Sequence, residues 1–137
     1  MRRVRLLAPF LLLLPLAACA TRAEAGAPPL LVQHVTIHWS RFHPATFDFP
    51  AGTTVRFVIH NTDPIDHEFI LGSRAVQTYI EHTAHPDHDG SVPGQISVPA
   101  GATVQTTYTF GRPGTVLLGC HVPGHYAYGM RSRVRVS

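Results

Sequence analysis

The stretch TVLLGCHVPGHYAYGMRSRVRV, residues 115–136, contains two hydrophobic, strand-like runs separated by a short turn. Cys120, His125 and Met130 follow one another in this turn at intervals of five residues. A thiolate, an imidazole and a thioether form a soft donor set, which suits copper better than other biological metals. The sequence therefore predicts that this turn binds one copper ion.

Three donors from one turn leave a trigonal copper site one imidazole short, so a second histidine must come from another part of the fold. His67, in the segment NTDPIDHEF at residues 61–69, is the best candidate. Four other histidines show no ligand spacing and are interpreted as ordinary strand and loop residues. They are His34, His38, His43 and His60.

Simpler interpretations of the same residues stay open. Met130, the only methionine besides Met1, could pack in the core. Cys120 could be an inert buried thiol, or a nucleophile paired with His125. A nucleophilic cysteine usually lies at a helix N-terminus or beside a cation. Because Cys120 instead follows a strand-like run and precedes a Pro-Gly turn, the sequence favours a metal ligand over a protease nucleophile.

The pattern C-x4-H-x4-M with an upstream histidine resembles that of the cupredoxins, small type 1 blue copper proteins such as plastocyanin and azurin. The resemblance covers residues 30–137. It implies that His67, Cys120 and His125 are equatorial copper ligands and that Met130 is the axial ligand. It also implies an electron carrier that cycles between Cu(I) and Cu(II), because a site between the preferences of the two oxidation states needs little rearrangement.

In the family, the C-terminal histidine conducts the electron near the surface, so the resemblance gives this role to His125. Tyr126 and Tyr128 are then candidates for the docking surface, although either ring could simply pack against the end of the fold. One departure from plastocyanin-like and azurin-like proteins is Glu68, which follows the first histidine where these proteins usually have Asn. The hydrogen bonds that tune the copper in the family therefore do not carry over directly.

Copper tolerance or copper delivery is the alternative function. The chain has His121 directly after Cys120, Glu68 in place of Asn, and a histidine-rich loop, EHTAHPDHDG, at residues 81–90. This loop is either a second, weaker metal site or a polar loop without a ligand, since such tracts indicate metal binding only through composition. The possible secondary ligands are His82, His85 and His88.

Short β-branched or aromatic runs bounded by Gly, Pro or Asp dominate the chain after its N-terminal segment. The segments PAGTTV (50–55) and PAGATV (99–104) repeat one turn-then-strand unit, which is typical of a Greek-key β-sandwich. We expect an all-β fold of about seven to eight strands, with a helical turn over Ala75–His82 in its long loop. The expected strands are Val35–Trp39, Thr53–His60, His67–Leu71, Gln95–Val98, Thr103–Phe110, Thr115–Cys120 and Arg131–Val136.

Residues 1–19, MRRVRLLAPFLLLLPLAAC, combine arginines, an apolar run and small residues, which is typical of a secretory signal rather than of a membrane-spanning helix. The end of this segment, LAAC, resembles a bacterial lipobox, which would make Cys19 a lipidated residue; an ordinary cleaved signal is the alternative. We therefore expect a lipoprotein signal peptide at 1–18, a flexible tether at 19–29 and one domain at 30–137. The expected location is the periplasm or extracytoplasmic face, with lipid on Cys19 as the membrane anchor.

The chain has 11 basic and 8 acidic residues, but Arg2, Arg3 and Arg5 lie in the predicted signal. The remaining charges balance, so the basic pI does not indicate a nucleic-acid partner. We expect a monomer with a redox partner protein, such as a cytochrome or an oxidase. If Cys19 carries lipid, Cys120 is the only free thiol, and an unpaired thiol in an oxidising compartment favours a bound metal.

Catalytic copper chemistry is not favoured. Multicopper oxidases need several His-x-His pairs, and the sequence contains none. A copper nitrite reductase would need a second cupredoxin domain, for which 137 residues are too few. A dinuclear oxidase-subunit site needs two cysteines in its loop, where this chain has only Cys120. The sequence therefore predicts a protein that is not an enzyme.

Overall fold

A computed structural model describes residues 30–83 and 87–137. The predicted signal peptide, Cys19, the tether and His85 lie outside the described residues. Nine strands and one helix form in the described part. In chain order they are β1 (Leu30–Ile37), β2 (Phe42–His43), β3 (Thr46–Phe49), β4 (Thr53–Asn61), β5 (His67–Gly72), α1 (Arg74–Glu81), β6 (Gln95–Val98), β7 (Thr103–Phe110), β8 (Gly114–Gly119) and β9 (Arg131–Val136).

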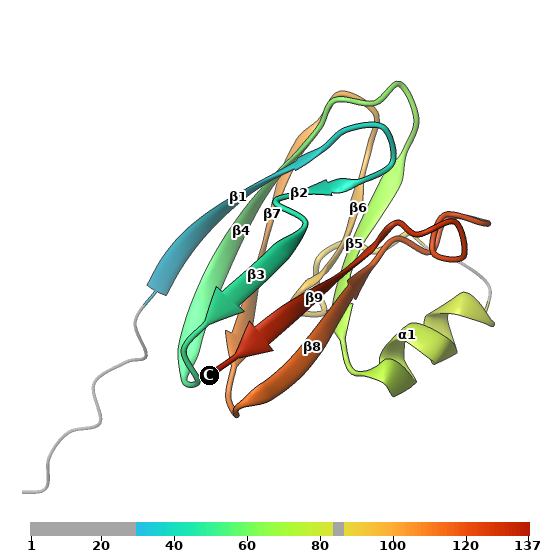
Figure 1. Cartoon of the computed structure of the whole chain (residues 1–137). Coiled ribbons are helices and arrows are strands. Elements are labelled where there is room, and N and C mark those ends of the chain that lie inside the picture. The colour runs from blue at the N-terminus through green and yellow to red at the C-terminus, as the bar shows by residue number, and fades with distance from the viewer. Residues whose placement is uncertain (1–29, 84–86) are drawn as a thin grey trace, which may run out of the picture.

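Two sheets make up a sandwich, with α1 beside β5 and β8 (Figure 1). The first sheet has the strand order β2-β1-β4-β7, and the second has the order β3-β9-β8-β5-β6. Most neighbouring strands are antiparallel, whereas β1 pairs with β4, and β3 with β9, in parallel. The architecture agrees with the expected all-β Greek-key sandwich and its short helix.

The expected strands differ from the observed ones at several ends and in one segment. Strand β1 begins at Leu30, five residues before the expected Val35, because its first residues already pair with β4. The short strands β2 and β3 were missed because Pro44 and Pro50 interrupt their segment, and β2 is only two residues long. The first expected strand extends to Trp39, but β1 ends at Ile37 because the backbone of Trp39 is left-handed, with φ of 54°. The strand expected to reach Cys120 ends one residue earlier, at Gly119.

The core lies between the two sheets and is rich in phenylalanine. Strand β4 alternates buried residues with more exposed ones, which places Phe57 in the core with no exposed surface. The Phe57 ring centroid lies 5.1 Å from that of Phe69 on β5, in the opposite sheet. Burial of each such ring contributes about 1.5–3 kcal/mol, so these rings hold the two sheets together.

Strand β5 is buried along its whole length, because β8 and β6 pair with its two edges, the core covers one of its faces and α1 lies beside the strand (Figure 1). Helix α1 begins where the Ser73 hydroxyl accepts a hydrogen bond from the Val76 amide at 3.3 Å. Gln77 then donates its amide to the carbonyls of Ile70 on β5 and Leu117 on β8, at 3.0 and 3.2 Å. These contacts fix the helix against the two strands that carry the candidate ligands.

Candidate metal centre

The candidate ligands meet at one end of the second sheet. His67 is the first residue of β5, and Cys120 follows the last residue of β8. Because β5 and β8 are antiparallel, the start of one strand and the end of the other lie at the same end of the sheet. His125 and Met130 lie on the turn that joins β8 to β9, so the topology itself brings the four residues to one place.

Hydrogen bonds close the turn between β8 and β9, residues 120–130, which we call the ligand turn. The Cys120 amide donates to the Met130 carbonyl at 3.1 Å, and the Met130 amide donates to the His125 carbonyl at 2.9 Å. The His125 amide donates to the Val122 carbonyl at 2.9 Å across Pro123 and Gly124. Gly124 has a φ of 86°, which the third position of a type II turn requires. This turn directs His125 back toward Cys120.

Three donor atoms converge at the base of this turn. The Nδ1 atoms of His67 and His125 lie 3.2 Å apart, and the Cys120 sulfur lies 3.4 Å from Nδ1 of His125 and 3.9 Å from Nδ1 of His67. A point equidistant from three atoms at these separations lies about 2 Å from each, close to the bonds of ~2.0–2.3 Å that imidazole and thiolate make to zinc. The donor set therefore fits a first-row metal ion, and its softness suits copper.

Met130 is fully buried in the core beside this group. Its backbone pairs with both Cys120 and His125, which places it at the end of the same turn. A buried thioether in this position agrees with either expected role, a weak axial ligand or a packing residue. Its role as the axial ligand stays a prediction.

Cys120 is inaccessible to solvent. Burial raises the pKa of its thiol to about 11, although the Glu68 amide, which donates to the sulfur at 3.3 Å, partly opposes this increase. A buried thiol with a raised pKa is a poor nucleophile. The burial of Cys120 thus disfavours the protease interpretation. A bound metal ion, by contrast, would stabilise the thiolate directly.

His125 is half-buried. Burial lowers the pKa of its imidazole, and the nearby His67 ring adds to the decrease. A lowered pKa keeps the ring neutral near pH 7, which is the form that binds metals.

Glu68 connects the start of β5 to the ligand turn. Besides its amide contact with the Cys120 sulfur, its carboxylate accepts the backbone amide of His121 at 3.0 Å, and the side chain is buried. One residue therefore contacts the thiol and also holds the residue that follows it. The departure from the usual Asn keeps an oxygen acceptor at this position.

His121 is buried, and its two ring nitrogens already have partners. Nδ1 lies 2.6 Å from Oε2 of Glu81, and Nε2 lies 2.7 Å from Oε1 of Gln77. The ring stacks on Tyr126, with a centroid separation of 4.7 Å and an interplanar angle of 15°. Both ring nitrogens of His121 therefore contact side chains of helix α1, and His121 is not free to act as an additional ligand.

Asp63 is a site residue that the sequence reasoning missed. Its Oδ2 lies 2.9 Å from Nε2 of His67, and it is buried. Burial alone would raise the pKa of Asp63, but hydrogen bonds from the Ser40 and Trp39 amides and from His67 outweigh burial and hold it below its ordinary value. The only signal in the sequence was general: metal-binding histidines commonly donate their other ring nitrogen to a carboxylate, and Asp63 lies near His67 in the chain.

The histidine-rich loop does not form a comparable cluster in the described part of the chain. There, only His67, Cys120 and His125 form a group of three or more potential donors within 4.8 Å of one another. His82 is exposed, and His85 lies outside the described residues.

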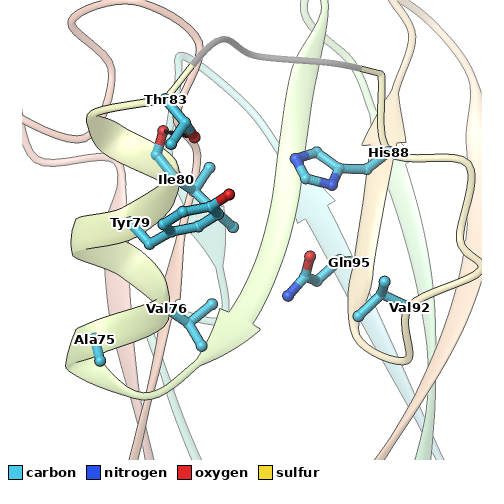
Figure 2. A pocket seen from close by; sticks show the side chains of 8 residues that line it. All are labelled: Ala75, Val76, Tyr79, Ile80, Thr83, His88, Val92 and Gln95. Carbon is cyan, nitrogen blue, oxygen red and sulfur yellow. Dashed lines mark hydrogen bonds between the residues drawn. The ribbon is translucent and has the colours of Figure 1, made fainter.

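His88 lies across from α1 on the wall of a hollow of about 700 Å³ (Figure 2). Its buried Nε2 has no hydrogen-bond partner among the described residues, and it lies 3.9 Å from Oε1 of Glu68. His88 is thus the member of the expected secondary set that the structure places near the main site.

The two expected docking tyrosines differ in exposure. Tyr128 is 84% exposed, whereas Tyr126 is half-buried under its stacking contact with His121. Trp39, which the sequence reasoning placed in a strand, is 78% exposed. The neighbouring Arg41 donates to the Tyr128 carbonyl at 3.2 Å, so the Trp39 turn touches the ligand turn.

No helix within residues 30–83 and 87–137 combines the length and the apolar character needed to span a membrane.

Comparison with known proteins gives a consistent result. No model of a protein family matches the chain. It is 40% identical over 115 residues to the copper-resistant cuproprotein CopI of Rubrivivax gelatinosus, covering 82% of this chain and 70% of the relative. It is 28% identical to CopI of Pseudomonas aeruginosa, covering 69% of this chain and 70% of the relative. A solved structure of auracyanin B superimposes with a TM-score of 0.64 at 25% identity, covering 80% of this chain and 90% of that structure.

Proposed function

Because this chain belongs to the CopI family of cuproproteins and is a copper-binding protein with the cupredoxin fold, we propose that it transfers single electrons through one type 1 copper ion. His67, Cys120 and His125 are the proposed equatorial ligands, and Met130 is the proposed axial ligand. The observation that carries the proposal is the convergence of two imidazole nitrogens and one thiol sulfur within 3.9 Å of one another.

The surrounding residues support this role by restricting movement of the ligands. Glu68 holds the ligand turn through the His121 amide, and helix α1 holds the His121 ring from the other side. Bound copper would supply a one-electron couple between Cu(I) and Cu(II). The fixed ligand set lies between the coordination geometries that Cu(I) and Cu(II) each prefer. Little therefore has to move when an electron arrives or leaves.

His125 is the proposed exit for the electron because, of the three equatorial candidates, it alone is not fully buried. The exposed side chains of Tyr128 and Trp39 extend from adjoining turns, where aromatic rings provide apolar contact area for a redox partner. A cytochrome or an oxidase is the proposed kind of partner. The proposed function involves no catalysis by this chain.

Titration of the purified chain with copper tests this proposal. We expect one tightly bound ion per chain and an intense visible charge-transfer band from the Cys120 thiolate in the Cu(II) form. C120S should abolish the band, because an alcohol is neither soft nor ionised at neutral pH. C19A is the matched control, since it removes the other cysteine and should leave the band unchanged. A colourless Cu(II) form of the wild-type chain would overturn the ligand assignment.

Copper tolerance is the second candidate function. Two observations favour it. The CopI relatives reported above are named copper-resistant proteins. The buried Nε2 of His88 has no hydrogen-bond partner within the part of the chain that the structure describes, and it lies 3.9 Å from Oε1 of Glu68. A protein that scavenges copper would gain from an additional, weaker site, whereas an electron carrier needs one ion. The number of copper ions per chain therefore discriminates between the two functions.

The N-terminal features belong to the same proposal. Residues 1–18 are proposed to export the chain and residues 19–29 to tether it, with lipid on Cys19 as the membrane anchor. An extracytoplasmic location would explain why the thiol of Cys120 needs a metal ion as protection. Release of a C19A variant from the membrane fraction, compared with the wild-type chain, tests the anchor independently of the copper site.

A further inference from the structure

The Asp63 carboxylate collects three hydrogen bonds from two separate parts of the fold. Its Oδ1 accepts the Trp39 amide at 2.7 Å, and its Oδ2 accepts the Ser40 amide at 2.8 Å and faces Nε2 of His67 at 2.9 Å. The carboxylate is only 8% exposed. One buried anion therefore joins the turn after β1 to a candidate copper ligand.

The turn that Asp63 holds has an unfavourable backbone. Trp39 and Ser40 have φ values of 54° and 51°, in the left-handed region that residues with a β-carbon seldom adopt. Each residue held in such a sparsely populated region costs about 1–3 kcal/mol, and the conformation persists only where the surrounding contacts determine it. Backbone hydrogen bonds between His38 and Arg41, at 3.1 and 3.2 Å, close this turn. The Trp39 and Ser40 amides inside it both point at the Asp63 carboxylate, so Asp63 adds the side-chain contacts that hold it.

The His67 ring is oriented by the groups on its two sides. Its Nδ1 faces the Cys120 sulfur and Nδ1 of His125, whereas its Nε2 faces an oxygen that can only accept. A neutral imidazole carries one proton, and the acceptor draws that proton to Nε2. The lone pair on Nδ1 is then directed at the candidate metal position.

We propose that Asp63 is a positioning residue, which fixes the ring and tautomer of His67 for copper and makes the strained Trp39 turn part of the metal site. This inference rests on the proposed role of His67 as a ligand. A carboxylate on the far nitrogen makes the imidazole a stronger donor. Its negative charge also stabilises the more highly charged Cu(II) over Cu(I), so Asp63 lowers the reduction potential.

The first test uses the full-length chain loaded with Cu(I), which is diamagnetic and suits NMR. We expect the Nε2 proton of His67 to be protected from exchange in the wild-type chain and to exchange faster in D63N. The matched control is D66N, which removes the same charge from the same loop. Asp66 is exposed, and its carboxylate accepts the Ala100 amide at 2.8 Å, a bond for which asparagine keeps an oxygen; the carboxylate on the His67 ring is that of Asp63.

The second readout is the reduction potential. We expect D63N to weaken the preference for Cu(II) over Cu(I) about tenfold, which for a one-electron couple is an increase of ~59 mV, and D66N to change it much less. If D63N and D66N give equal shifts and equal exchange rates, only the general charge matters and the inference is overturned. If His67 resonances do not respond to copper at all, the proposed ligand set fails instead, so the two failures are distinguishable.

A glycine background keeps the test valid if D63N alone does not fold. Replacing Trp39 and Ser40 together with glycine removes the strain in the turn, so this region no longer depends on the carboxylate. D63N in that background should still raise the potential and speed exchange of the His67 proton. Loss of both effects in the glycine background would overturn the role at His67 and leave Asp63 a turn-stabilising residue only.

Discussion

Glu68 accepts the backbone amide of His121 at 3.0 Å, and this contact joins the first residues of β5 to the turn that carries three of the four candidate ligands. Its own amide contacts the Cys120 sulfur at 3.3 Å. Glu68 therefore holds the start of β5, which carries His67, in place against the turn that carries Cys120, His125 and Met130. We expect the oxygen acceptor of Glu68 to matter more here than its negative charge.

Replacement of Glu68 separates these two contributions. E68A should lower the free energy of unfolding by about 1–3 kcal/mol, because it leaves the buried His121 amide without an acceptor. E68Q keeps an acceptor oxygen and should cost clearly less. Denaturant unfolding of the two variants measures the difference. If E68A and E68Q lower the free energy of unfolding equally, the charge of Glu68 beside His88 stabilises the turn, rather than its hydrogen bond to His121.

Gly119 directly precedes Cys120 and has no room for a side chain. A β-carbon there would lie 2.6 Å from the Tyr126 ring and 2.7 Å from Oε1 of Gln77. G119A should therefore destabilise the chain by about 1–3 kcal/mol, the usual cost of overpacking, and should change the visible band of the copper form. G111A is the matched control, because nothing lies within 4 Å of a β-carbon at Gly111. An unchanged melting temperature for G119A would contradict the close packing of Tyr126 against this strand.

The sequence predicted the parts of the site that follow from local pattern. The spacing of Cys120, His125 and Met130 survives any small error in strand boundaries, and the structure places the three residues on one turn. Their role as ligands stays a prediction. The strand expected at Arg131–Val136 is observed with the same bounds as β9, where arginines alternate with buried residues. Helix α1 begins and ends within one residue of the predicted range.

The missed features depend on contacts between distant segments. Asp63 receives hydrogen bonds from residues 23 and 24 positions earlier, and no local pattern reports such a contact. The left-handed backbone at Trp39 was invisible for the same reason, because tryptophan is a good strand former and the residues that hold its turn lie elsewhere. His121 looked like a spare ligand until the fold showed its ring between Gln77 and Glu81.

The metal-free thiol should be unreactive at neutral pH. Burial raises the pKa of Cys120 to about 11, and only the thiolate attacks an alkylating reagent. The alkylation rate of the folded, metal-free chain should therefore increase steadily between pH 7 and pH 10. Because the folded pKa lies above the unfolded one, the stability tied to this thiol is complete below pH 9.0 and decreases as the pH rises toward 11. Rapid alkylation at pH 7, with a reagent such as iodoacetamide, would contradict the burial of the site.

Met130 can be tested by a substitution that keeps its volume. M130L should retain copper, because the three equatorial donors remain. It should raise the reduction potential, because the loss of a donor destabilises the more highly charged Cu(II) more than Cu(I). The cost in unfolding free energy should stay below about 1.5 kcal/mol, as for other volume-conserving changes in a core. Titration and voltammetry give the two results. Complete loss of copper binding would identify Met130 as a principal ligand, or as a residue on which the whole turn depends.

The histidine-rich loop decides between the electron carrier and the copper scavenger. A chain with His82, His85 and His88 all replaced by alanine should keep the band and potential of the main site, because none of the three is assigned as a ligand there. Of the two that the structure describes, neither His82 nor His88 belongs to the group formed by His67, Cys120 and His125. If the loop contributes to copper tolerance, the same variant should bind less copper per chain, and cells that depend on it should become more sensitive to copper.

H88A alone sharpens this test, because His88 is the member of the set that lies next to Glu68. H34A is a suitable control, since that histidine shows no ligand spacing and lies in β1, away from the loop. We expect the main site to survive every one of these changes. A second copper-binding event in the wild-type chain that is retained in H34A and lost in both H88A and the triple variant would make copper tolerance the leading function. A single event in all of them would leave electron transfer as the function that the site supports.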